Sequence, residues 1–284
     1  MSCVAPFRCL AASTAAVSDE TSAESLAKRK ILLPVLGRSA TLLQPLLQEL
    51  ALDLELADCV IALDPGLAFG VLQLANVRGN CRTGVAWQLP LALVASGRSA
   101  LQELLDSAPR LESAADPTVV PQLFELVRNA VVRGCLGHWL ARELGRCNPK
   151  KAFLAGLLAE VPQMATLACG GRGRCRPKTL VLLARLLCFD LEQLARDQDV
   201  IHDLNKPLAA ITQTAELLRQ NHAVDGAAAI ADLPNGHPWL NLDPNQWRQL
   251  ADHGSNLARW AGDNLYRLAP WDFMSRLERH KPWA

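Results

Sequence analysis

Apolar residues recur along most of this chain at intervals of three and four positions, the spacing that places side chains on one face of an α-helix. The pattern starts at Ile31, and the face of its first helix consists of Leu36, Ala40, Leu43, Leu47 and Leu50. The alternation of apolar and polar residues that marks a half-buried strand is not found. The pattern therefore predicts an all-α protein built from amphipathic helices.

Capping residues mark several of the predicted helix ends. Asp53 is placed to cap a second helix. Asp64 and Pro65 end that helix and begin a third, because a proline in the first turn leaves no hydrogen bond unmade. A long apolar helix is predicted over residues 123–144, and Gly145 is the glycine that closes it.

A glycine-rich loop separates two of the later helical segments. The helix that begins at Pro149 ends before Pro162, and a helical run extends from Thr179 toward Gln220. The loop between them carries four basic residues, Arg172, Arg174, Arg176 and Lys178. The free N–H groups of such a loop are suited to bind a phosphate or a nucleotide, and the alternative is a loop that is only solvated.

Composition narrows the class of protein. The 284 residues are 50% hydrophobic and 20% charged, which is typical of globular chains and not of disordered or fibrous ones. The net charge of +1 gives no general attraction to nucleic acid or to a membrane, and no stretch is apolar over the roughly 18 residues of a membrane span. The nine cysteines contain no CxxC pair, so we expect reduced thiols in a cytoplasmic protein without nucleic-acid or membrane partners.

Four motifs follow one another in the first two thirds of the chain. They are LLPVL at 32–36, DPGLAFGVLQLAN at 64–76, LALVASGRSALQELL at 91–105 and KAFLAGLLAEVPQMA at 151–165. In this order they resemble the HDOD family, the HD-related output domain of bacterial signalling proteins, over residues 31–195. The resemblance implies an HD-like helical domain in a signalling protein.

The resemblance also locates the positions at which HD-type phosphohydrolases hold a divalent metal. Their upstream histidine aligns with Asn129, and their His-Asp doublet aligns with Ala159 and Glu160. An amide, a methyl group and one carboxylate are too few ligands for a metal-activated water, so we expect no metal, no cofactor and a scaffold that binds a partner. His138 is expected to be a packed histidine, and the alternative is a substitute ligand.

A second resemblance begins beyond the first. IHDLNKPLAAI at 201–211 resembles the H-box of the dimerisation and phosphoacceptor (HisKA) domain of sensor histidine kinases, and NLARWAGDNLYRL at 256–268 is similar to its closing helix. The resemblance implies that His202 accepts a phosphoryl group with Asp203 as the neighbouring base, and that residues 196–270 form a homodimer. One apolar seam supports such a hairpin: Ile201, Leu204, Leu208, Ile211, Ala215 and Leu218. The alternative is an extra helical pair that completes the HDOD core, with His202 on its surface.

These observations divide the chain into four parts. We expect a flexible N-terminal tail at 1–30, the HDOD-like domain at 31–195, the antiparallel HisKA-like hairpin at 196–270 and a C-terminal tail at 271–284. The residues after the hairpin are too few for the ATPase domain of a kinase. The expected function is that of a non-catalytic regulatory protein that binds a signalling partner, a kinase or a response regulator, near 74–76 or Trp87. The alternatives are a phosphorelay component and a metal-dependent phosphohydrolase.

Overall fold

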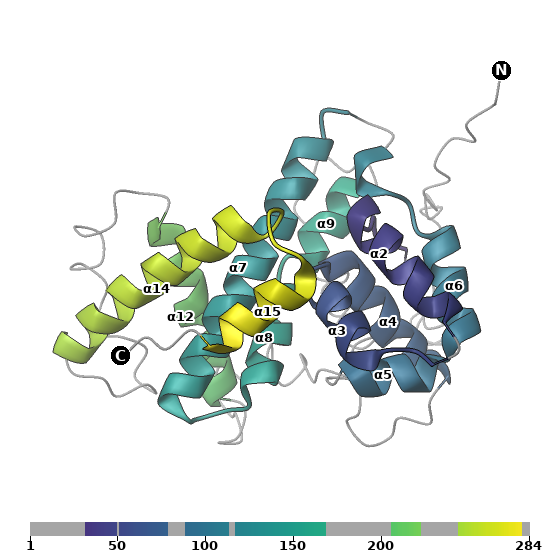
Figure 1. The fold of residues 1–284 in the computed structure, drawn as a ribbon. Helices are drawn as coiled ribbons and strands as arrows, with labels where there is room; N and C mark the ends of the chain where they lie inside the picture. The colour runs from purple at the N-terminus through teal and green to yellow at the C-terminus, as the bar shows by residue number, and fades with distance from the viewer. Residues whose placement is uncertain are drawn as a thin grey trace, which may run out of the picture.

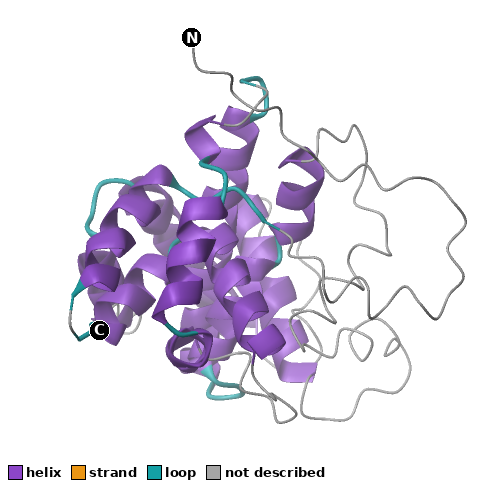
Figure 2. Ribbon diagram, turned by 90° about the vertical axis from the view of Figure 1, so that its right-hand side faces the viewer, coloured by secondary structure: helices purple, strands orange, loops and turns teal. Residues whose placement is uncertain are grey.

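The computed structural model describes residues 32–49, 51–78, 89–113, 117–168, 206–222 and 244–279. Within these ranges the regular elements are helices and no strand occurs, as Figure 2 shows. One isolated parallel bridge joins Val35 to Arg110. The prediction of an all-α protein is therefore confirmed. None of the described helices is both long and apolar enough to cross a membrane.

The described helices fall into an N-terminal and a C-terminal series. The first series contains α2 (Gly37–Gln48), α3 (Leu54–Ala62), α4 (Pro65–Arg78), α5 (Leu89–Ser96), α6 (Arg98–Ser107) and the short 3-10 helix η2 (Leu111–Ser113). The second contains α7 (Val120–Leu144), α8 (Pro149–Leu158), α9 (Val161–Ala168), α12 (Lys206–His222), α14 (Pro244–Asn264) and α15 (Pro270–Arg279).

Several helix ends lie where the sequence predicts them. The Asp53 side chain accepts hydrogen bonds from the N–H groups of Glu55 and Leu56 at the start of α3, which is the geometry of an N-cap. α4 begins at Pro65. Gly145 follows α7 with a φ of 60°, a left-handed conformation that a glycine adopts without strain.

α7 is the central helix of the molecule (Figure 1), and α8, α9, α12 and α14 all pack against it. Its contact with α8 is backbone to backbone. A Cβ atom added to Gly137 would lie 2.8 Å from the carbonyl oxygen of Ala152, and one added to Gly156 would lie 2.7 Å from that of Arg133. No larger side chain fits at these points, and the close approach holds the end of α8 beside the middle of α7.

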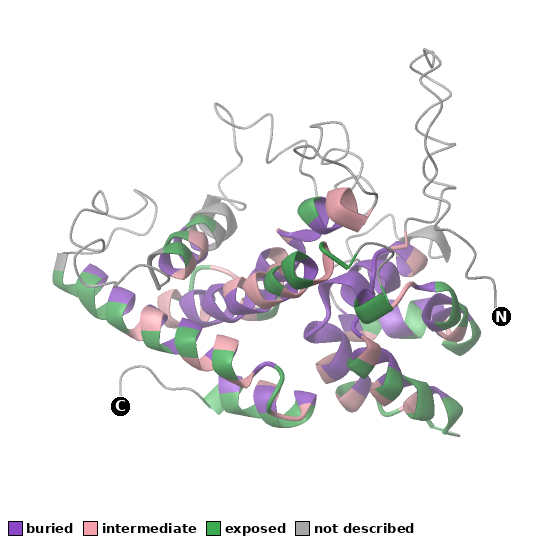
Figure 3. Cartoon of the chain, turned by 90° about the horizontal axis from the view of Figure 1, so that it is seen from above, coloured by how far each residue is buried: buried purple, intermediate pink, exposed green. Residues whose placement is uncertain are grey.

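The C-terminal helices α12 and α14 pack on α7 and on each other. Figure 3 shows that α14 has one buried and one exposed face. Seven apolar residues of these two helices and of the position directly after α14 are at most 3% exposed: Ile211, Ala215, Leu218, Leu250, Leu257, Ala261 and Leu265. Ile211, Ala215 and Leu218, the part of the predicted seam whose burial the structure describes, are therefore buried within one chain.

Three expectations about helix extents can be compared with the structure. The helix that begins at Pro149 does end before Pro162, because α8 stops at Leu158, but the sequence did not predict α9, which begins at Val161 and accommodates Pro162 in its first turn. Residues 271–279 are not a tail but belong to α15, which packs against α3, buries Leu277 and stacks Phe273 on Trp260 with ring centroids 4.9 Å apart. Of the helical run expected from Thr179, only the part from Lys206 onward is described.

Candidate functional site

The positions that align with the HD metal site meet where α7 passes the end of α8. Asn129 lies half-buried on α7, and Ala159 and Glu160 form the turn between α8 and α9. Glu160 is only 5% exposed. Burial and the nearby Glu216 raise the pKa of the Glu160 carboxyl, and the charge and hydrogen bonding of Arg133 oppose that rise.

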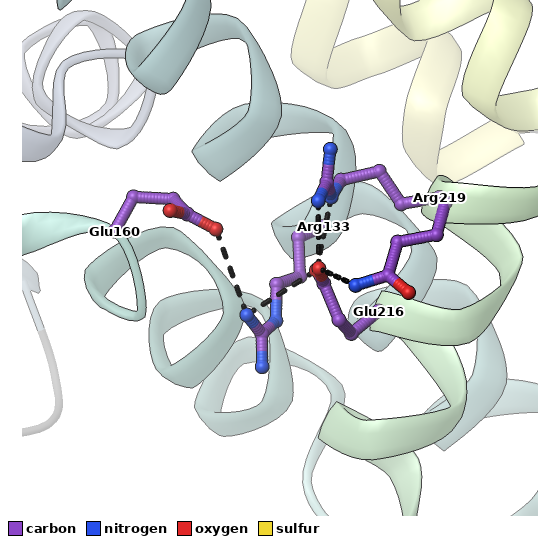
Figure 4. A network of polar contacts seen from close by, with 5 residues as sticks. Arg133, Glu160, Glu216 and Arg219 are labelled. Carbon is purple, nitrogen blue, oxygen red and sulfur yellow. Dashed lines mark hydrogen bonds and ion pairs between the residues drawn. The ribbon is translucent and has the colours of Figure 1, made fainter. Parts of the chain in front are cut away.

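Arg133 supplies the positive charge at this site. It lies on α7 one turn after Asn129, so both residues share one face of the helix. Its Nη1 atom is 3.6 Å from Oε1 of Glu160 and 3.3 Å from Oε2 of Glu216, which lies on α12 (Figure 4). One guanidinium therefore joins the position of the HD doublet to a helix of the C-terminal pair.

Residues of its own helix hold Glu216 in place. Arg219 donates from Nε to Oε2 at 2.9 Å and from Nη2 to Oε1 at 2.6 Å, and Gln220 donates to the same Oε1 at 2.6 Å. Burial acts to raise the pKa of Glu216, but the hydrogen bonds and charges of Arg219, Arg133 and Gln220 outweigh it and hold the pKa below its ordinary value. Glu216 is thus an oriented carboxylate that Arg133 can reach.

The residues at the HD positions do not fit a divalent metal. Ala159 has no ligand atom, Asn129 offers a weak amide oxygen in place of an imidazole, and the carboxylate of Glu160 faces a guanidinium. Across the ranges that the structure describes, no group of three or more His, Cys, Asp or Glu side chains is arranged to hold a metal ion.

The DPGL segment, one of the HDOD-like motifs, has a structural role. Asp64 is fully buried, and its carboxylate accepts hydrogen bonds from the N–H groups of Leu36 at 2.8 Å and Leu67 at 3.0 Å. A Cβ atom on Gly66 would lie 2.3 Å from the carbonyl oxygen of Pro34, so only glycine fits there. These contacts join the DPGL segment to the Leu-Pro segment, and burial raises the pKa of Asp64 to about 6 against the opposing effect of the hydrogen bonds.

His138 lies in the buried part of α7 and is 9% exposed. Its Nδ1 atom is buried without a hydrogen-bond partner. Burial, together with the charges of Arg142 and Lys150, lowers its pKa to about 4, so the imidazole is neutral at physiological pH. This is the environment of a packed histidine.

The remaining predicted site residues lie outside the described residues. They are the phosphoacceptor pair His202 and Asp203 and the basic residues of the glycine-rich loop, Arg172, Arg174, Arg176 and Lys178. Their roles stay predictions.

Sequence reasoning missed Arg133, Glu216 and Arg219. No local motif joins positions 133 and 216, because their contact depends on how α12 packs on α7. One signal was available, since Arg133 is the one charged residue in the otherwise apolar stretch 130–137. A lone arginine among buried residues predicts a buried acidic partner.

Comparison with known proteins supports the first of the two resemblances. The model of the HDOD domain family matches residues 33–173 and does not reach the H-box-like segment, which stays a prediction. No curated protein matches the chain. A crystal structure of the MmoQ response regulator (fragment 20–298) from Methylococcus capsulatus is similar at 19% identity over 88% of this chain and 92% of that chain, with a TM-score of 0.40, which is too low to bear on the fold. Residues 33–173 of this chain are an HDOD domain.

Proposed function

We propose that this protein is a non-catalytic regulator in bacterial signal transduction, and that its HDOD domain binds a protein partner, a kinase or a response regulator. The observation that carries the proposal is the ion pair between Glu160 and Arg133 at the position of the HD doublet. A carboxylate paired with a guanidinium is not free to bind a metal, and Ala159 and Asn129 supply no imidazole. The geometry therefore favours a scaffold over a hydrolase.

The partner surface that we propose lies near Leu74 on α4, where α5 packs beside it. α5 contains no charged residue, and its Leu91 and Val94 side chains are 46% and 62% exposed. They are three positions apart, so they share one face of the helix. An apolar face of this kind suits a protein partner that buries it.

The catalytic half of the proposal is tested by hydrolysis. The purified chain is incubated with bis(p-nitrophenyl) phosphate and p-nitrophenyl phosphate in the presence of Mn²⁺, Ni²⁺ or Mg²⁺, and the rates are compared with those of Glu160→Gln. We expect equal rates that match metal and buffer alone. A metal-dependent rate that Glu160→Gln abolishes would show that the protein is a phosphohydrolase.

The binding half is tested by comparing surface variants. Affinity-purified wild type is compared by quantitative mass spectrometry with Leu91→Asp/Val94→Asp and with Leu217→Asp, an exposed leucine on α12 that serves as the matched control. We expect a signalling protein to co-purify with wild type and with Leu217→Asp but not with Leu91→Asp/Val94→Asp. We also expect that protein to bind purified wild type directly. Equal retention by all three proteins would contradict the proposed surface.

A further inference from the structure

Four charged residues at this site form one network of ion pairs. Glu160 and Glu216 carry the negative charges, and Arg133 and Arg219 carry the positive ones (Figure 4). The side chains are at most 20% exposed. Charges buried to this degree are strongly destabilising unless each has a partner, so each member depends on the others.

Arg133 places a positive charge between two carboxylates, the arrangement in which a bridging metal would also be found. A single nitrogen of its guanidinium lies between a carboxylate at the HD doublet position and a carboxylate of a different helix. The guanidinium is covalently part of the chain, so unlike a bound metal it cannot dissociate. The close α7–α8 contact at Gly156 sets the distance between Arg133 and the turn that carries Glu160.

We propose that Arg133 has replaced the divalent metal of the HD site as a built-in cation, and that through Glu216 it makes α12 a part of that site. The proposal goes beyond the regulatory function, because it states what holds the site together whether or not a partner binds there. A bound metal joins the ligands within one domain. Here the cation belongs to the HDOD domain and one of its two carboxylates belongs to the C-terminal pair, so the site and the packing of α12 are coupled.

Chemical rescue tests the cation. The thermal midpoint of the full chain is measured for wild type, for Arg133→Ala and for the matched control Arg128→Ala, with and without millimolar methylguanidinium chloride. Arg128 is on the same helix, and its 3.8 Å ion pair with Glu125 is at the surface, with side chains 40% and 57% exposed. We expect Arg133→Ala to lower the midpoint by about 6 °C or more and Arg128→Ala by less than about 2 °C.

The rescue must also be selective. Methylguanidinium is expected to restore at least half of the loss in Arg133→Ala and to leave wild type and Arg128→Ala unchanged. Equal losses in the two variants, or the same response of all three proteins, would overturn the proposal. If Arg133→Ala does not fold, the double variant Arg133→Met/Glu160→Gln tests the proposal instead. Removal of both buried charges is expected to restore folding. A double variant that does not fold would contradict the proposal.

Hydrogen exchange tests the coupling to α12. In Arg133→Ala the backbone amides of residues 206–222 are expected to exchange several-fold faster than in wild type, while those of α3 stay unchanged. Unchanged exchange in α12 would show that Arg133 does not hold this helix.

Discussion

Gly156 gives the sharpest prediction about the packing that creates the site. In Gly156→Ala the new Cβ would lie 2.7 Å from the carbonyl oxygen of Arg133 and 2.8 Å from the amide nitrogen of Gly134. Ordinary contacts begin near 3.4 Å, so α8 must move away from α7 by about 0.7 Å. The obstacle is helix backbone, which cannot rotate aside as a side chain does.

The magnitude follows from two opposing effects. Overpacking of this kind costs about 1–3 kcal/mol, and glycine to alanine in a helix gains at most about 1 kcal/mol. We expect a net loss of about 1–2 kcal/mol in the free energy of unfolding. With an m-value of about 2 kcal/mol per molar urea, the urea midpoint falls by roughly 0.5–1 M. Movement of α8 also displaces Glu160 from Arg133.

Gly262→Ala is the matched control, because it makes the same chemical change in another helix, α14. The three atoms nearest to its Cβ would all belong to the guanidinium of Arg128, with Nη2 at 2.8 Å, and a flexible side chain can swing away. We expect the helix propensity to dominate, so that this variant unfolds at the same or a slightly higher urea concentration. A Gly156→Ala protein as stable as Gly262→Ala would refute the reasoning.

Three further predictions concern single residues. Asp64→Ala leaves the buried N–H groups of Leu36 and Leu67 without an acceptor and should lower the free energy of unfolding by about 3 kcal/mol in urea titrations; a loss below about 1 kcal/mol would contradict the structural role of the DPGL motif. The pKa of His138 is lowered from 6.5 to about 4, so the stability from its neutral form is complete above pH 6.5 and declines as the pH falls toward 4. The difference in unfolding free energy between wild type and His138→Leu should therefore fall by about 3 kcal/mol from pH 7 to pH 4, and a constant difference would argue against a buried neutral imidazole. If the phosphorelay alternative is correct, a lysate with radiolabelled ATP places an acid-labile, base-stable label on wild type and none on His202→Ala; an unlabelled wild type in an active lysate removes this alternative.

Local chemistry predicted much of the helical framework. The caps at Asp53 and Gly145 and the proline start at Pro65 depend on a few neighbouring residues, so the sequence contains all the information they need. Pro162 gave half of the answer. The helix from Pro149 ends before it as predicted, but a proline is also acceptable in a first turn, and the sequence did not show that α9 begins at Val161 after the turn at Ala159 and Glu160.

Long-range packing is what the pattern did not determine. The apolar seam of α12 predicts a partner surface, but nothing in its spacing distinguishes a second chain from α7 of the same chain, and the structure buries Ile211 and Leu218 within one chain. The contact between Arg133 and Glu216 joins residues 83 positions apart (216 minus 133), which no local motif can specify. The alignment of Glu160 with the HD doublet located the site, and the structure supplied its cation.

Metal content tests the central claim most directly. The full chain is produced in medium supplemented with manganese, iron and nickel, purified without chelator, and analysed by inductively coupled plasma mass spectrometry beside Glu160→Gln. Because Arg133 already provides the cation at the HD position, we expect far less than one metal ion per chain in both proteins. One or more ions per wild-type chain, absent from Glu160→Gln, would contradict this account and restore the metal-dependent phosphohydrolase.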